Sequence, residues 1–206
     1  MNIGIYLYPD VEALDFAGPF EVFTTASRVR KRLHPRATEP FSVFSIAESR
    51  APVRARAGLH IIPDHTIDEH PPIQVLIVPG GVITAELEKQ NVLDWVVRTA
   101  DCAERVASVC TGAFILAKAG VIQGGPVTTH WEDQAELAEM FPALEVLNGP
   151  RWVEQGSRIT SAGIAAGIDM SLHLVSCLCA PSLALATAQQ MDYPWNAYRV
   201  PSVHDA

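Results

Sequence analysis

Positive charge is scarce in this sequence. Its 206 residues include 15 Lys and Arg against 23 Asp and Glu, which gives a formal net charge of −8 and a sequence pI near 5.3. The one basic cluster, residues 28–36, has the pattern of a solvated helix end and the loop after it. Because no stripe of Lys and Arg is available to displace counterions from phosphates, we expect no nucleic-acid partner.

Long apolar runs are also missing, and we expect no secretory leader. No apolar run reaches the roughly 20 residues that a membrane helix needs, so we expect no membrane partner. Met1 leads directly into the strand-like residues 2–8. The four cysteines, at positions 102, 110, 177 and 179, have neither disulfide-framework nor zinc spacing. These absences favour a protein of the reducing cytoplasm.

The remaining pattern is that of a globular α/β protein. Apolar residues make up 49% of the chain and charged residues 18%, which is enough for a sizeable core. Apolar strand-like runs alternate with helical patterns, so we predict one domain, residues 1–191, with a doubly wound, mostly parallel sheet between helices. Residues 192–206 are predicted to form an irregular tail. The expected strands are 3–8, 41–47, 73–78, 105–109, 127–130, 144–147, 151–154 and 158–161, and the expected helices after the first are 86–100, 112–119, 132–140, 163–179 and 182–191.

One stretch, RVASVCTGAFILAKAG at residues 105–120, has the pattern of a nucleophile elbow. A buried strand ends at Val109, Cys110 stands at the turn, and strong helix formers follow up to the C-cap position of Gly120. The positive end of the helix dipole is expected to lower the pKa of the Cys110 thiol and to favour a nucleophilic thiolate. The alternative is that Cys110 is a small buried apolar residue.

A second candidate, Asp15, follows the first strand in the apolar frame LDFAG. Burial among Leu and Phe side chains is expected to raise the pKa of Asp15, so that it serves as a general acid near neutral pH. The alternative is an N-cap role for the helix that begins nearby, with Pro19 in its first turn.

Other candidates lie at the ends of neighbouring strands, where ligands bind in open α/β sheets. Gly80 and Gly81 would bring backbone N–H groups close to a substrate, or simply form a tight turn. Thr111 either places its hydroxyl near the thiolate or caps the helix. His130, expected at a strand end beside Trp131, is a possible base or a packed core residue.

No metal site is expected from the spacing of the remaining ligand-type residues. The histidines at 60, 65 and 70 do not have the spacing of a helical metal pair. The cysteines at 102, 177 and 179 are interpreted as packing residues.

Four segments in order resemble the ThiJ/PfpI superfamily: VEALDFAGPFEVF, VPGG, ASVCTGAFILAKAGVIQGGPVTTHWED and RITSAGIAAGIDMSLHLV. Within it, the chain is most similar to the isocyanide (isonitrile) hydratase branch and to amidase-like domains of some AraC-type regulators. The resemblance covers about residues 3–191.

This resemblance implies a flavodoxin-like fold, a homodimer and no cofactor. It also implies that Cys110 is the nucleophile, Asp15 the acid/base and Thr111 a positioning hydroxyl. Gly80 and Gly81 would supply an amide pocket, and residues 161–164, with Gly163 and Ile164, would line the cavity. The segment after the last helix departs from that of known hydratases, so the resemblance does not define the substrate pocket.

The expected activity is hydration of an isocyanide, a small-molecule substrate, to an N-substituted formamide. A soft isocyanide carbon suits a thiolate beside a proton donor. Two alternatives remain: another cysteine-dependent activity of glyoxalase or amidase type, or a small-molecule or redox sensor without turnover.

Overall fold

Residues 1–195 are described by the computed structural model of the chain. Residues 196–206, most of the expected tail, lie outside the described residues. In residues 1–195, no helix is long and apolar enough to cross a membrane.

A seven-stranded sheet forms the centre of the molecule, in the strand order β10-β11-β7-β6-β1-β2-β5. Every neighbouring pair is parallel except the β10–β11 hairpin, which is antiparallel. The predicted doubly wound, mostly parallel sheet is therefore confirmed. The strands are β1 (Asn2–Tyr6), β2 (Ser42–Ala47), β5 (His65–Thr66), β6 (Val75–Val78), β7 (Arg105–Val109), β10 (Trp152–Gln155) and β11 (Arg158–Ser161).

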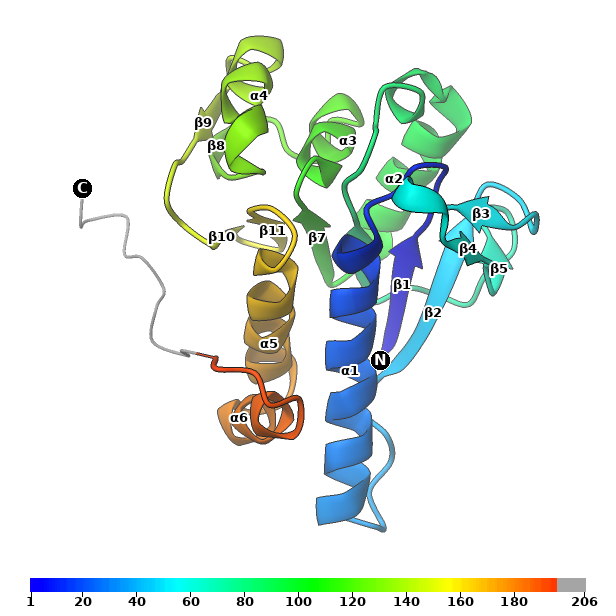
Figure 1. Cartoon of the computed structure of the whole chain (residues 1–206), viewed down its shortest axis with the longest axis vertical. Helices are drawn as coiled ribbons and strands as arrows, with labels where there is room; N and C mark the ends of the chain where they lie inside the picture. Colours follow the sequence, from blue (N-terminus) through cyan, green and yellow to red (C-terminus); the bar gives the residue numbers. More distant parts are fainter. Residues whose placement is uncertain (196–206) are drawn as a thin grey trace.

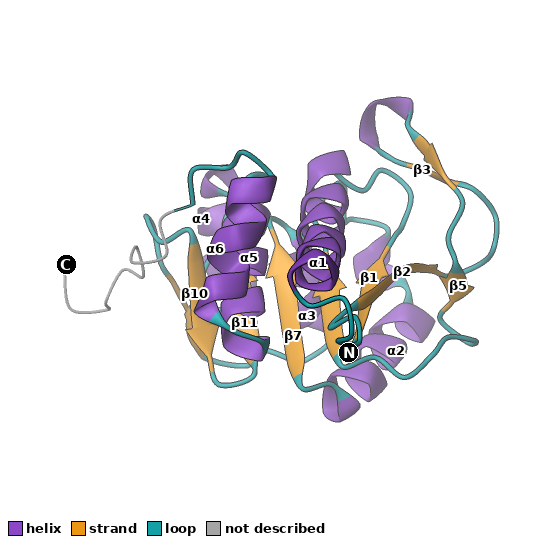
Figure 2. Ribbon diagram, turned by 90° about the horizontal axis from the view of Figure 1, so that it is seen from below, coloured by secondary structure: helices purple, strands orange, loops and turns teal. Residues whose placement is uncertain are grey.

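Helices cover both faces of this sheet (Figures 1 and 2). On one face, α1 (Ala13–Leu33), α5 (Ala166–Leu178) and α6 (Pro181–Gln190) pack against one another. On the other face lie α2 (Gln90–Cys102) and α3 (Gly112–Lys118).

Smaller elements complete the described chain. Their bounds are β3 (Val53–Arg54), β4 (His60–Ile61), β8 (Gly125–Val127), α4 (Gln134–Met140) and β9 (Leu144–Val146), with short 3-10 turns at Arg56–Gly58, Glu86–Glu88 and Trp131–Asp133. Strands β3 and β4 pair as one two-stranded sheet, and β8 and β9 as another.

Side chains that point alternately to the two faces of the sheet build two hydrophobic cores. In β6, Val75 and Ile77 join the core that includes residues of α1 and α5, whereas Leu76 and Val78 join the core that includes residues of α2 and α3. Successive side chains of a strand point to opposite faces, so a strand covered on both faces must be apolar throughout. This requirement explains why these strands could be recognised as continuous apolar runs.

Three local predictions were wrong. The first helix begins at Ala13, so Pro19 lies inside the helix rather than in its first turn. The helix expected over 86–100 is a 3-10 turn followed by α2. The strand expected over 127–130 ends at Val127 and lies outside the main sheet. His130 is therefore not at the end of a strand; it caps a 3-10 turn by accepting a hydrogen bond from the Glu132 amide.

Candidate active site

Cys110 occupies the sharp turn between β7 and α3. Its φ of 55° lies in the left-handed region, which is uncommon outside glycine and is found where the surrounding structure holds the backbone in place. The first turn of α3 requires a glycine at position 112, because a Cβ there would collide with the Val78 carbonyl oxygen. The predicted elbow is therefore present, and α3 passes directly over the end of β6.

Asp15 lies in the first turn of α1 and is completely buried. Its Oδ2 accepts a hydrogen bond from the Gly80 amide at 3.0 Å. Its other oxygen, Oδ1, is buried and has no hydrogen-bond partner within residues 1–195. The N-cap position is held by Glu12, without a side-chain cap, so the alternative role of Asp15 as N-cap is wrong.

Backbone pairing brings the start of α1 to the turn after β6. Val11 and Gly81 form an isolated antiparallel bridge, the Glu12 amide donates to the Gly80 carbonyl, and the Val82 amide donates to the Asp10 carbonyl. A Cβ on Gly81 would meet the Asp10 carbonyl, and its φ of 144° also favours glycine. These contacts fix Asp15 relative to the elbow.

The backbone amides of Gly80 and Gly81 both donate hydrogen bonds to side chains of the protein. Gly80 donates to Asp15, and Gly81 donates to Thr111 Oγ1 at 2.9 Å, while the Thr111 hydroxyl donates to the Gly81 carbonyl at 3.0 Å. Thr111 does not cap α3 through its side chain. The expectation that these two glycine amides face a substrate is corrected, because in the structure they hold Asp15 and Thr111 in place.

Burial dominates the electrostatics of Asp15. Removal from water raises the pKa of Asp15 from 3.8 to about 7, the Gly80 amide opposes this shift, and the charge of Glu12 adds to it. The thiol of Cys110 lowers the pKa by a smaller amount. Asp15 is thus able to give and to take a proton near neutral pH, as the sequence predicts.

The pKa of the Cys110 thiol is raised, whereas the sequence predicts that it is lowered. Burial, followed by the negative charge of Asp15, raises the pKa of Cys110 to about 12, against a smaller lowering by the amide and hydroxyl of Thr111. The expected lowering of this pKa by the helix dipole is wrong, because only 7% of Cys110 is exposed and a carboxylate faces it. Deprotonation of the thiol at neutral pH therefore needs a base beside it.

Three further candidates lie around the backbone of Cys110. The Cys110 amide donates to the carbonyls of Ser161 and Ala162, which places the following Gly163 and Ile164 next to the elbow. A Cβ on Gly163 would collide with the His130 ring. Ile164 is 39% exposed and has a φ of 49°, a strained conformation for a β-branched residue.

Sequence reasoning missed two residues that shape this site. The buried Tyr8 hydroxyl donates to the Pro79 carbonyl at 3.0 Å and so supports the turn that holds Asp15. Asp133 adds a negative charge that raises the pKa of Cys110. Tyr8 ends the predicted first strand, so its position at the carboxyl edge of the sheet was the available signal.

The packing role expected of two other cysteines is wrong, since Cys102 and Cys177 are exposed; Cys179 is half-buried. Cys177 lies beside Glu154 and His173, with potential ligand atoms all within 4.8 Å of one another. The sequence spacing did not reveal this cluster, because Glu154 lies on a different element.

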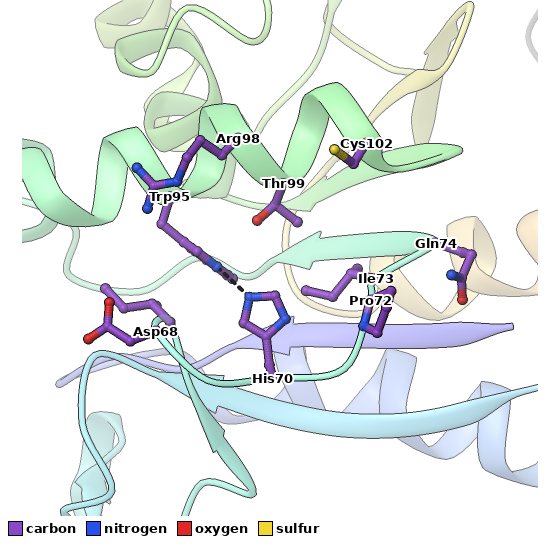
Figure 3. Close-up of a pocket in the computed structure, with 10 residues that line it drawn as sticks. Asp68, His70, Pro72, Ile73, Gln74, Trp95, Arg98, Thr99 and Cys102 are labelled. Atoms are coloured by element: carbon purple, nitrogen blue, oxygen red, sulfur yellow. Dashed lines mark hydrogen bonds between the residues drawn. The ribbon is translucent and has the colours of Figure 1, made fainter.

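A separate cavity of about 480 Å³ lies at the opposite end of the central strands, between α2 and the segment before β6 (Figure 3). Its His70 is a structural residue: Trp95 Nε1 donates to His70 Nε2 at 2.9 Å, and His70 Nδ1 lies 2.8 Å from the Pro71 carbonyl. Cys102 also lines it. The cavity does not include Cys110 or Asp15.

The sequence as a whole matches a known protein family. The model of the DJ-1/PfpI family matches residues 1–177. The chain belongs to the DJ-1/PfpI family. The fold and the superfamily resemblance expected from the sequence are thereby confirmed.

Relatives within the family differ in function. The chain is 33% identical to an isonitrile hydratase of Pseudomonas putida, over 94% of this chain and 78% of that protein. It is 28% identical to the HTH-type transcriptional regulator GbdR of Pseudomonas aeruginosa, over 93% of this chain but only 50% of the regulator.

Solved structures of the family superpose well. A ThiJ/PfpI family protein from Pseudomonas syringae matches with a TM-score of 0.81 and 29% identity, over 98% of this chain and 78% of that one. Drosophila melanogaster DJ-1beta matches with a TM-score of 0.79 and 19% identity, over 94% of this chain and 98% of that one, which supports the fold alone.

Proposed function

We propose that this protein is an isocyanide hydratase, a carbon–nitrogen lyase that adds water to an isocyanide and releases an N-substituted formamide. The observation that carries the proposal is the buried pair of Cys110 and Asp15, in which the carboxyl has a pKa of about 7 next to a protonated thiol. The 33% identity to an isonitrile hydratase gives independent support.

The first half of the reaction moves one proton from sulfur to carbon. Above pH 7 the Asp15 carboxylate takes the thiol proton while Cys110 Sγ attacks the terminal isocyanide carbon. Protonated Asp15 then gives that proton to the same carbon. A new C–S bond and a new C–H bond have formed, and the product is a thioimidate, R–N=CH–S–Cys110.

The second half consumes water. The Asp15 carboxylate takes a proton from a water molecule, whose oxygen adds to the thioimidate carbon, and the proton passes to nitrogen. The tetrahedral intermediate, R–NH–CH(OH)–S–Cys110, then collapses: the C–S bond breaks, the hydroxyl proton returns to sulfur through Asp15, and R–NH–CHO leaves. These steps use only the chain's own residues and water.

Other site residues have positioning and lining roles in this proposal. Thr111, Gly80 and Gly81 hold the pair in register through the hydrogen bonds between the elbow and the turn after β6. Gly163 and Ile164 would line the substrate cavity. His130 stays a possible participant, since its ring packs against Gly163.

A sensor without turnover is the second candidate. The similarity to the regulator GbdR, over 93% of this chain, favours it. In that case a small molecule would bind beside Cys110, and the thiol would act as a ligand contact or as an oxidisable group.

A substrate panel with the intact protein tests the proposal. We expect formamide formation from a simple alkyl or aryl isocyanide and no turnover of methylglyoxal or of an amide. Turnover of methylglyoxal or of an amide, without turnover of any isocyanide, would contradict hydration and indicate another cysteine-dependent activity. No turnover of any of these, with Cys110 shown to react with a thiol reagent, would favour the sensor.

The proposal includes assembly as a homodimer, which the family resemblance implies. Light scattering coupled to size-exclusion chromatography measures the mass directly, and we expect twice the 22.3 kDa of the chain.

A further inference from the structure

Three side chains with different metal-binding atoms converge where α5 packs against β10. Glu154 Oε2 lies 2.7 Å from His173 Nε2, and Cys177 Sγ lies 3.6 Å from the same nitrogen. Among the described residues this is a cluster whose potential ligand atoms all lie within 4.8 Å of one another. Figure 2 shows α5 over this edge of the sheet.

Regular elements hold the three residues. His173 and Cys177 are four residues apart on α5, so they share one face of the helix. Glu154 follows Trp152 by two residues in β10 and therefore points to the same face of the strand, where Trp152 packs in the core with residues of α5. The Trp152 and His173 rings are 5.3 Å apart between centroids, which orients the imidazole.

We propose that Glu154, His173 and Cys177 form a binding site for Zn²⁺, with a water molecule or an external ligand in the fourth position. A thiolate, an imidazole and a carboxylate form the mixed sulfur, nitrogen and oxygen set that zinc accepts in tetrahedral geometry. Mg²⁺ and Ca²⁺ prefer oxygen ligands alone, so the cysteine and histidine disfavour them.

The distance between the nitrogen and sulfur ligand atoms suits a tetrahedral zinc ion. Bonds of about 2.0 Å to nitrogen and 2.3 Å to sulfur place those atoms about 3.5 Å apart in a tetrahedron, close to the 3.6 Å between His173 Nε2 and Cys177 Sγ. A nitrogen–oxygen edge is about 3.3 Å by the same geometry, so Glu154 must withdraw by about 0.6 Å from its present hydrogen bond. Its side chain is exposed enough to make that movement.

The position of the cluster suggests a structural clamp rather than a part of the reaction. His173 lies seven residues beyond Ala166, the first residue of α5, and is therefore about 10 Å along the helix axis from the start of α5. A bound ion would tie the β10–β11 hairpin, which forms one edge of the sheet, to the helix that covers it. Zinc should therefore stabilise the folded state by binding to it in preference to the unfolded chain.

Cobalt titration of the full chain tests the site, because Co²⁺ replaces Zn²⁺ and gives a sulfur-to-cobalt charge-transfer band when a thiolate is bound. We expect saturable binding of one Co²⁺ per chain with this band, displaced by one equivalent of Zn²⁺. Partial quenching of the tryptophan fluorescence by Co²⁺ gives a second readout, since one of the four tryptophans, Trp152, has its ring against His173.

Matched variants assign the band to these residues. Cys177→Ser should abolish it, and His173→Gln and Glu154→Gln should each weaken binding by more than about tenfold, a loss that even outer-shell mutations reach. Cys179→Ser, on the same chain segment, and Cys110→Ala should leave it intact. Circular dichroism confirms that each variant is folded.

The opposite results overturn the proposal. Absence of saturable binding by the wild type does so, as does a charge-transfer band that survives in Cys177→Ser or disappears in Cys110→Ala. A thermal midpoint that Zn²⁺ raises in the wild type and in Cys177→Ser alike would also contradict the site.

Discussion

Asp15 and Gly80 lie 65 residues apart in the chain, and the Gly80 amide donates a hydrogen bond of 3.0 Å to Asp15 Oδ2. This contact holds a fully buried carboxyl beside the Cys110 thiol at the end of β7. It joins the start of α1, the turn after β6 and the elbow into one site.

Substitution of Asp15 by Asn should stabilise the protein at high pH. The folded-state pKa of Asp15, about 7, is above its ordinary 3.8, so the folded state binds more protons than the unfolded state between these values, and its stability falls as pH rises through them. A shift of about three units at 1.36 kcal/mol each sets an upper limit of about 4 kcal/mol. Urea unfolding should show Asp15→Asn close to the wild type at pH 4 and more stable at pH 8. A stability difference that does not change with pH would contradict the buried charge.

Substitution of Glu12 by Gln should move the pH dependence of activity to lower pH. The charge of Glu12 raises the pKa of Asp15, so its removal makes Asp15 ionise at lower pH. In the wild type, kcat/KM for an isocyanide should rise with pH through about 7, because the ionised carboxylate must take the thiol proton. The pH profile of Glu12→Gln should keep this shape with its midpoint shifted downward. An upward shift, or no rise near pH 7 in the wild type, would refute this assignment.

Substitution of Thr111 by Val should loosen the elbow. The change removes the hydroxyl that accepts from the Gly81 amide and donates to the Gly81 carbonyl. Leaving these groups without partners should cost about 1–3 kcal/mol of stability and should lower kcat more than it raises KM. Thr111→Ser keeps the hydroxyl and should restore most of both losses. If Thr111→Ser is as impaired as Thr111→Val, the hydroxyl is not the cause.

Substitution of Gly80 by Ala should damage the site by crowding. An added Cβ would lie 2.6 Å from the Thr111 amide nitrogen and 2.8 Å from Asp15 Oδ2, and the backbone atom has little freedom to move away. We expect a loss of turnover of at least about tenfold, by analogy with small misplacements of catalytic groups. Gly124→Ala is the matched control, since its Cβ would meet only the Ala143 carbonyl at an ordinary 3.5 Å. Equal activity of the two variants would contradict the tight fit.

Local pattern was sufficient to predict the elbow and the two strands that form the β10–β11 hairpin. The strand before Cys110, the glycine at 112 and the helix after it are neighbours in sequence, as are β10 and β11. Apolar runs located the central strands because both faces of the sheet are covered.

Contacts between distant segments could not be predicted from the sequence. The use of the Gly80 and Gly81 amides depends on side chains 65 and 30 residues away. The raised pKa of Cys110 depends on burial and on Asp15, properties of the folded chain that a helix-dipole argument ignores. The cluster of Glu154, His173 and Cys177 likewise joins Glu154 on a strand to His173 on a helix, 19 residues further along the chain.

Formamide release from a simple isocyanide, compared among the wild type, Cys110→Ala and Asp15→Asn, tests the central claim most directly. We predict turnover by the wild type, none above background by Cys110→Ala, and a loss of at least about 100-fold in Asp15→Asn, the usual contribution of a general acid/base. Cys110→Ala that hydrates the isocyanide at the wild-type rate would contradict the account.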